Sequence, residues 1–115
     1  MVRRRRLKKA PPAYQLFVKR FPGLGRAWEQ LGDAGAAAGP LDARTQRLIK
    51  LALAIGSRQE GAVHSGVRKA LAAGATAAEL EQVVALAASL IGLPATVAAF
   101  CQVREELLKE GAGKP

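Results

Sequence analysis

The only histidine of the chain, His64, lies four residues after Glu60 and four residues before Arg68. Residues four apart share one side of an α-helix, so these three side chains are expected to form a single stripe. A carboxylate one turn away can fix the tautomer of an imidazole, and together the two groups make a minimal acid–base pair. We therefore predict Glu60 and His64 as catalytic residues, with Arg58 and Arg68 binding a substrate carboxylate.

Each of these residues also has a purely structural interpretation. His64 borders an apolar helix face marked by Val63, Val67 and Leu71, where a histidine is often a hydrogen-bonded boundary residue, and the two arginines could belong to a solvated helix face. One histidine with scattered acids has no metal-ligand spacing, and the chain has no phosphate-binding glycine loop, so we predict no metal and no organic cofactor. The single cysteine, Cys101, is expected to be a buried structural thiol rather than a reactive one.

The segments that carry these residues are predicted to be helical. Apolar spacing and breaking residues predict helices over 13–20, 22–33, 42–56, 58–73, 77–91 and 94–110, with a small-residue loop over 35–40. Gly74 can take the left-handed conformation that ends a helix, and Thr76 and Glu79 have the spacing of a capping box. The predicted fold class is therefore all-α, a compact helical domain of about five or six helices.

Positive charge is concentrated at the start of the chain. The net charge is +9, and nine basic residues precede the first acidic residue, Glu29, so residues 27–115 are formally neutral. We predict a basic, flexible N-terminal arm over 1–12 and one helical domain over 13–115. The arm could touch RNA, DNA or anionic lipid, but without interleaved aromatic residues or a second basic patch we predict no specific nucleic-acid binding.

Residues 83–101 contain no charge and are about long enough to span a bilayer. Ser89, Gly92 and Pro94 interrupt this segment, and the Gly-Leu-Pro break is better explained as the junction of two buried helices. We therefore predict no membrane span. The basic start leads into the alanine and prolines of 10–12 rather than into an apolar segment, so we predict no signal peptide and a cytoplasmic location.

The helix predicted over 77–91 is apolar around more of its circumference than one core-facing stripe requires. In a chain of 115 residues, which has room for one hydrophobic core, this surplus predicts a subunit interface. We therefore expect the chain to form a homo-oligomer.

Three segments in order resemble the carboxymuconolactone decarboxylase and alkylhydroperoxidase-D-like family. Residues 41–54 look like its lead helix, residues 64–80 like its signature of a histidine followed by an alanine-rich turn and a capping acid, and residues 92–95 like its glycine-x-proline break. The resemblance implies a bacterial all-α protein that assembles, with a trimer or hexamer favoured. It also implies acid–base chemistry on a small carboxylated or lactone compound.

The peroxidase branch of that family carries Cys-x-x-Cys before the histidine, where this chain has Ser57 and Glu60. A peroxiredoxin-type antioxidant role is therefore an alternative that the resemblance implies and the missing cysteines oppose, because peroxide reduction needs an attacking and a resolving thiol. A second alternative is a non-catalytic oligomeric binding or scaffold protein. It follows from the short chain and its single catalytic candidate, His64.

Overall fold

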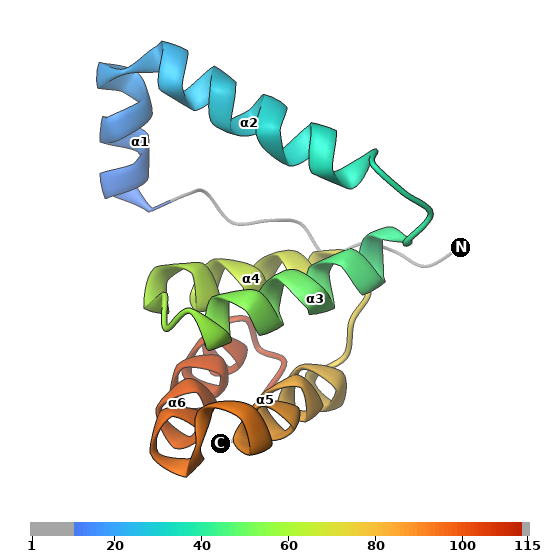
Figure 1. Ribbon diagram of the computed structural model, residues 1–115. Coiled ribbons are helices and arrows are strands. Elements are labelled where there is room, and N and C mark those ends of the chain that lie inside the picture. The colour runs from blue at the N-terminus through green and yellow to red at the C-terminus, as the bar shows by residue number, and fades with distance from the viewer. Residues whose placement is uncertain (1–10, 114–115) are drawn as a thin grey trace. The chain divides into compact units, whose positions relative to one another are not determined.

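The computed structural model describes residues 11–113, which contain helices and no strand (Figure 1). The described helices are α1 (Pro12–Arg20), α2 (Pro22–Ala36), α3 (Ala43–Gly56), α4 (Glu60–Ala72), α5 (Ala77–Ile91) and α6 (Leu93–Lys109). The predicted all-α class is confirmed. Residues 1–10 of the predicted arm lie outside the described residues, so its flexibility stays a prediction.

Two predicted boundaries differ from the observed ones by more than one residue. Helix α2 continues to Ala36, beyond position 33 and into the predicted loop. Helix α4 begins at Glu60 rather than at position 58, because Arg58 has a φ of 57° and its left-handed backbone cannot belong to a right-handed helix. Arg58 therefore lies in the short turn between α3 and α4.

The described chain divides into two compact units, residues 11–42 and residues 43–113. In the first unit, α1 and α2 pack where Gly25 lies against Val18; a Cβ at Gly25 would be 3.1 Å from Val18 Cγ1. Its larger apolar side chains remain open, and Trp28 and Leu31 of α2 are 64% and 67% exposed. Within 11–42, only Gly25 is buried, so this two-helix unit has no side-chain core of its own.

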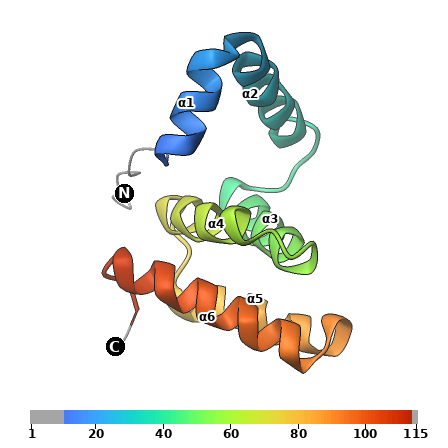
Figure 2. The ribbon, with the colours of Figure 1, turned by 90° about the vertical axis from the view of Figure 1, so that its left-hand side faces the viewer.

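The second unit is built from two helical hairpins in two layers. Helices α3 and α4 form one layer and α5 and α6 the other; α3 packs on α5 and α4 packs on α6 (Figures 1 and 2). Apolar side chains from all four helices fill the space between the layers, and the largest fully buried ones are Leu51, Leu80, Leu107, Val63, Val67 and Val103. This core fixes the faces that α4 and α6 turn toward each other.

The start of α5 has the capping box that the sequence predicts. The Thr76 hydroxyl accepts a hydrogen bond from the Glu79 N–H, and Glu79 Oε1 accepts one from the Thr76 N–H at 2.8 Å. The other Glu79 oxygen pairs with Arg44 of α3, so the cap also ties the two layers together. Gly74, with a φ of 97°, ends the preceding segment as expected.

None of the described helices combines the length and the apolar composition that crossing a bilayer requires. The uncharged segment 83–101 is divided between α5 and α6 at Gly92, whose φ of 85° is a left-handed conformation that glycine tolerates. The predicted junction of two helices is therefore observed. Burial of the two helices is partial, because Leu90 and Leu93 beside the junction are largely exposed.

Candidate functional site: a histidine–carboxylate pair between α4 and α6

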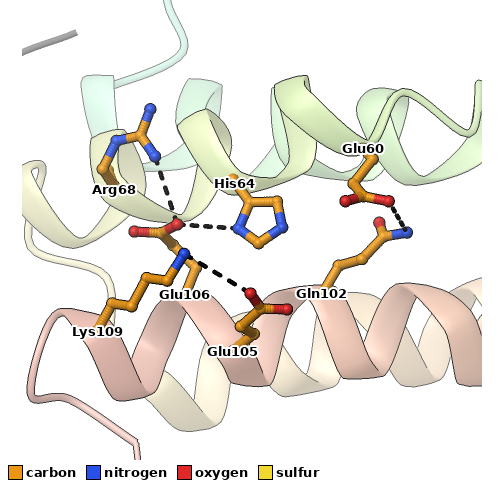
Figure 3. Close-up of polar contacts among 7 residues, drawn as sticks. All are labelled: Glu60, His64, Arg68, Gln102, Glu105, Glu106 and Lys109. Atoms are coloured by element: carbon orange, nitrogen blue, oxygen red, sulfur yellow. Dashed lines mark hydrogen bonds and ion pairs between the residues drawn. The ribbon is translucent and has the colours of Figure 1, made fainter. Parts of the chain in front are cut away.

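His64 lies on the side of α4 that faces α6. Val63 and Val67 point into the core, while His64 and Arg68 follow each other one turn apart along the edge of that buried face (Figure 3). Their side chains are 16% and 18% exposed, so both groups are largely withdrawn from water but still reachable. Of the predicted stripe of Glu60, His64 and Arg68, the last two therefore share this edge.

The partner of the imidazole is Glu106, a residue that the sequence prediction did not include. Glu106 comes from α6, between the core residues Val103 and Leu107, and its side chain is only 5% exposed. Its Oε1 atom lies 2.9 Å from His64 Nδ1 and 3.4 Å from Arg68 Nη1 (Figure 3). A buried carboxylate is costly unless hydrogen-bonded and paired, and these two contacts compensate its charge.

The predicted contact between Glu60 and His64 is replaced by two contacts across the helix pair. Glu60 is exposed at the first position of α4, and its Oε1 accepts a long hydrogen bond of 3.4 Å from Gln102 Nε2. Glu60 with Gln102 and His64 with Glu106 are each separated by 42 positions, so α4 and α6 run parallel in one register here. The facing helix presents a buried carboxylate directly to the imidazole, which explains why the helical neighbour is not its partner.

This arrangement distinguishes the two ring nitrogens of His64. A carboxylate can only accept a hydrogen bond, so Nδ1 carries the hydrogen and donates it to Glu106. In the neutral ring Nε2 is then the basic atom, and Figure 3 shows it on the side of the ring toward Glu60 and Gln102. A histidine held in this way can accept a proton at Nε2 and return it.

The two predicted substrate-binding arginines are not brought together. Arg58 is exposed in the turn before α4, whereas Arg68 is about 12 Å further along the helix axis, counted from the first residue of α4 at about 1.5 Å per residue. Arg68 also has a carboxylate already, since its guanidinium contacts Glu106. Its remaining N–H groups could still bind a ligand.

Two hollows in the second unit lie away from His64. One, of about 470 Å³, runs between α3 and α5 and is lined mostly by apolar side chains such as Leu48, Val83 and Leu90. The other, of about 360 Å³, lies between the start of α5 and the end of α6, with Glu81 and Arg104 in its wall. Within residues 11–113, no group of three or more His, Cys, Asp or Glu side chains could hold a metal ion.

Cys101 is exposed on α6, which corrects the prediction of a buried thiol. It follows Phe100, also exposed, whereas the core side of α6 is occupied by Ala99 and Val103. The inward stripe of α6 passes through positions 99 and 103, so position 101 falls on the outer side.

The fold and this site define a small helical protein with an interhelical histidine–carboxylate pair. The model of the carboxymuconolactone decarboxylase family matches residues 22–105, which is most of the chain, and the chain belongs to this family. No curated protein and no solved structure matches the chain. The match includes His64 and ends one residue before Glu106.

A selectively labelled sample can test the assignment of the ring nitrogens, because the chain has a single histidine. For the neutral form of the ring, ¹⁵N chemical shifts should report a protonated Nδ1 and a bare Nε2. Glu106→Gln should change this pattern, since an amide can also donate to Nδ1. Glu60→Gln should leave it unchanged, and the reverse outcome would return the role of partner to Glu60.

Proposed function

We propose that this chain is a carboxymuconolactone-decarboxylase-like enzyme that moves a proton on a small carboxylated or lactone compound. The observation that carries the proposal is the 2.9 Å contact of His64 Nδ1 with buried Glu106, which leaves Nε2 available for proton transfer. Glu106 takes the orienting role that was predicted for Glu60. Membership of the carboxymuconolactone decarboxylase family supports this class of reaction.

In a decarboxylation, the bond between the substrate carbon and its carboxylate breaks, and CO₂ leaves without the bonding electrons. The carbon that keeps the electron pair must take up a proton, and protonated His64 would deliver it from Nε2. Glu106 would stabilise the positive charge of the ring before delivery and hold its orientation. Glu60 and Gln102, on the Nε2 side of the ring, would contact the bound substrate.

An arginine would hold a second carboxylate of the substrate, and Arg68 is the better candidate of the two predicted residues. It is one turn from His64 and only partly engaged by Glu106, whereas Arg58 precedes the helix. A guanidinium offers a planar set of N–H donors that fits a carboxylate bidentately.

We also propose that the protein is cytoplasmic.

His64→Gln tests the enzyme directly, with carboxymuconolactone and related small carboxylated lactones as substrates and CO₂ release as the readout. We expect kcat to fall about 100-fold to 10,000-fold, the usual contribution of a positioned general acid or base. Glu105→Gln, which changes an exposed neighbour of Glu106, is the matched control and should keep kcat. Turnover that survives His64→Gln undiminished would remove the histidine from the mechanism.

The second candidate function is that of a non-catalytic oligomeric binding protein. It is favoured by the hollow between α3 and α5, whose apolar wall is distant from His64 and includes the exposed side chains Leu86 and Leu90. We propose that this surface mediates self-association, and the family resemblance favours a trimer or hexamer. Absence of turnover across the whole substrate panel, with an intact oligomer, would favour this function over the enzyme.

A further inference from the structure

Helices α3 and α4 approach each other most closely where Gly66 lies on Leu51. A Cβ at Gly66 would be 3.2 Å from Leu51 Cδ1 and 3.5 Å from the Leu51 Cα, so the missing side chain allows this contact. The helices are joined by the short turn 57–59 and run antiparallel, side by side in both views (Figures 1 and 2). Residues before Leu51 on α3 therefore lie opposite residues after Gly66 on α4.

Besides Arg68, which contacts Glu106, three basic residues lie within about one turn of this contact, toward the start of α3 and the end of α4. Arg47 is one turn before Leu51 and Lys50 directly precedes it, while Lys69 is three residues after Gly66. Helical spacing places Arg47 and Lys69 on the sides that face the opposite helix, with Lys50 at the flank. We call these three residues the α3–α4 basic cluster.

The cluster is positively charged without an internal counterion. The pKa of Lys69 is lowered, first by burial of part of its side chain and then by the positive charges of Arg47, Lys50 and Arg68. Arg68 has Glu106 as its partner, but no ion pair found within residues 11–113 involves a residue of the cluster. A negatively charged group placed there would relieve the mutual repulsion of these cations.

We propose that the α3–α4 basic cluster binds a small multivalent anion that carries phosphate or carboxylate groups. Arg47 supplies a planar donor set for two oxygens of such a group, and the two lysines supply mobile ammonium charges. The site is separate from the histidine–carboxylate pair, because His64 faces α6 whereas the cluster lies at the seam with α3. It therefore does not depend on the proposed enzymatic function.

A small anion fits the cluster better than a nucleic acid does. Base stacking needs aromatic side chains, and the α3–α6 unit holds one aromatic residue, Phe100, on α6. The cluster also spans only about one helical turn on each helix, which matches one or two acidic groups rather than a run of backbone phosphates. The folded chain thus provides a compact electropositive site that is not apparent from the sequence, where these residues are scattered.

The test is a titration of the full chain with pyrophosphate and, separately, with citrate, each against sodium chloride at equal ionic strength. Saturable binding should appear in calorimetry, and the pKa of Lys69, followed by NMR of its side-chain ammonium, should rise toward its ordinary value on binding. Preference for pyrophosphate or for citrate assigns the acidic group. Lys69→Gln should weaken binding about tenfold or more, as loss of one charge-assisted contact predicts.

Lys109→Gln is the matched control, because it removes the same charge from the exposed end of α6 and should change affinity less than about twofold. Lys50→Gln serves as a second variant within the cluster and should weaken binding as Lys69→Gln does. Equal weakening by Lys69→Gln and Lys109→Gln would overturn the site in favour of a general charge effect. A wild-type chain that binds neither anion beyond the chloride reference would overturn it as well.

Discussion

Glu106→Ala should lower the free energy of unfolding by about 3 kcal/mol, whereas Glu105→Ala should lower it by less than about 0.5 kcal/mol. The two substitutions remove the same atoms from adjacent positions of one helix, so their helix propensity terms are equal. Glu106 is nearly buried and bonded to both His64 and Arg68, while Glu105 is 62% exposed and pairs only with Lys109 of its own helix at 3.6 Å. Equilibrium urea unfolding measures both values.

The large loss of stability expected for Glu106→Ala arises because the substitution leaves two polar side chains without their carboxylate partner. His64 and Arg68 are both mostly withdrawn from water, and without Glu106 their polar groups lose a charged acceptor. The thermal midpoint should fall by at least about 10 °C for a domain of this size. Equal effects of Glu105→Ala and Glu106→Ala would show that the carboxylate does not hold α4 against α6.

The sequence predicts most of the helices well, because the signals that start and end a helix lie within a few residues of its ends. The capping box of Thr76 and Glu79 and the left-handed Gly74 are short-range chemistry, and both are observed. The predicted start of α4 is two residues early, because apolar spacing carries no information about the left-handed backbone of Arg58. These boundaries depend on the turn between two packed helices, which the sequence alone does not specify.

The partner of His64 could not be read from spacing, because it is 42 positions away and depends on how α4 and α6 pack. A usable signal was nevertheless present on α6. The inward stripe of that helix includes Ala99 and Val103, and continuing it reaches Glu106. A carboxylate on an apolar stripe requires a cationic or hydrogen-bonding partner. His64 and Arg68, which share one side of α4, were candidates for that partner.

The candidate site was thus predicted in part. The stripe of His64 and Arg68 on α4 was correct, as was the principle that a carboxylate would orient the imidazole. The carboxylate in contact with His64 is Glu106 and not Glu60, whereas substrate binding by Arg58 or Arg68 stays a prediction. Tertiary packing decided which carboxylate meets His64: the spacing on α6 marks Glu106 as an inward carboxylate, but it does not name the side chain of α4 that this carboxylate contacts.

Leu90→Glu should weaken self-association about 100-fold or more, while Ala85→Glu should change it little. Both substitutions add one carboxylate to α5, but Leu90 lies in the wall of the hollow between α3 and α5 and is 86% exposed, whereas Ala85 lies outside that wall. A carboxylate enclosed by an apolar interface loses its hydration without gaining a partner. A loss of about 2.8 kcal/mol corresponds to the expected 100-fold change.

Sedimentation velocity across micromolar concentrations distinguishes the outcomes. The wild type and Ala85→Glu should sediment as the same oligomer, whereas Leu90→Glu should shift toward the protomer. Leu86→Glu, which changes a second position in the wall of the hollow, should behave like Leu90→Glu. Among the residues that the structure describes, α5 buries only Leu80 and Val84, so contact with another surface is what would remove its other leucines from water. A wild type that stays monomeric throughout this range would contradict the proposed interface, and an oligomer that tolerates both leucine substitutions would place the contact elsewhere.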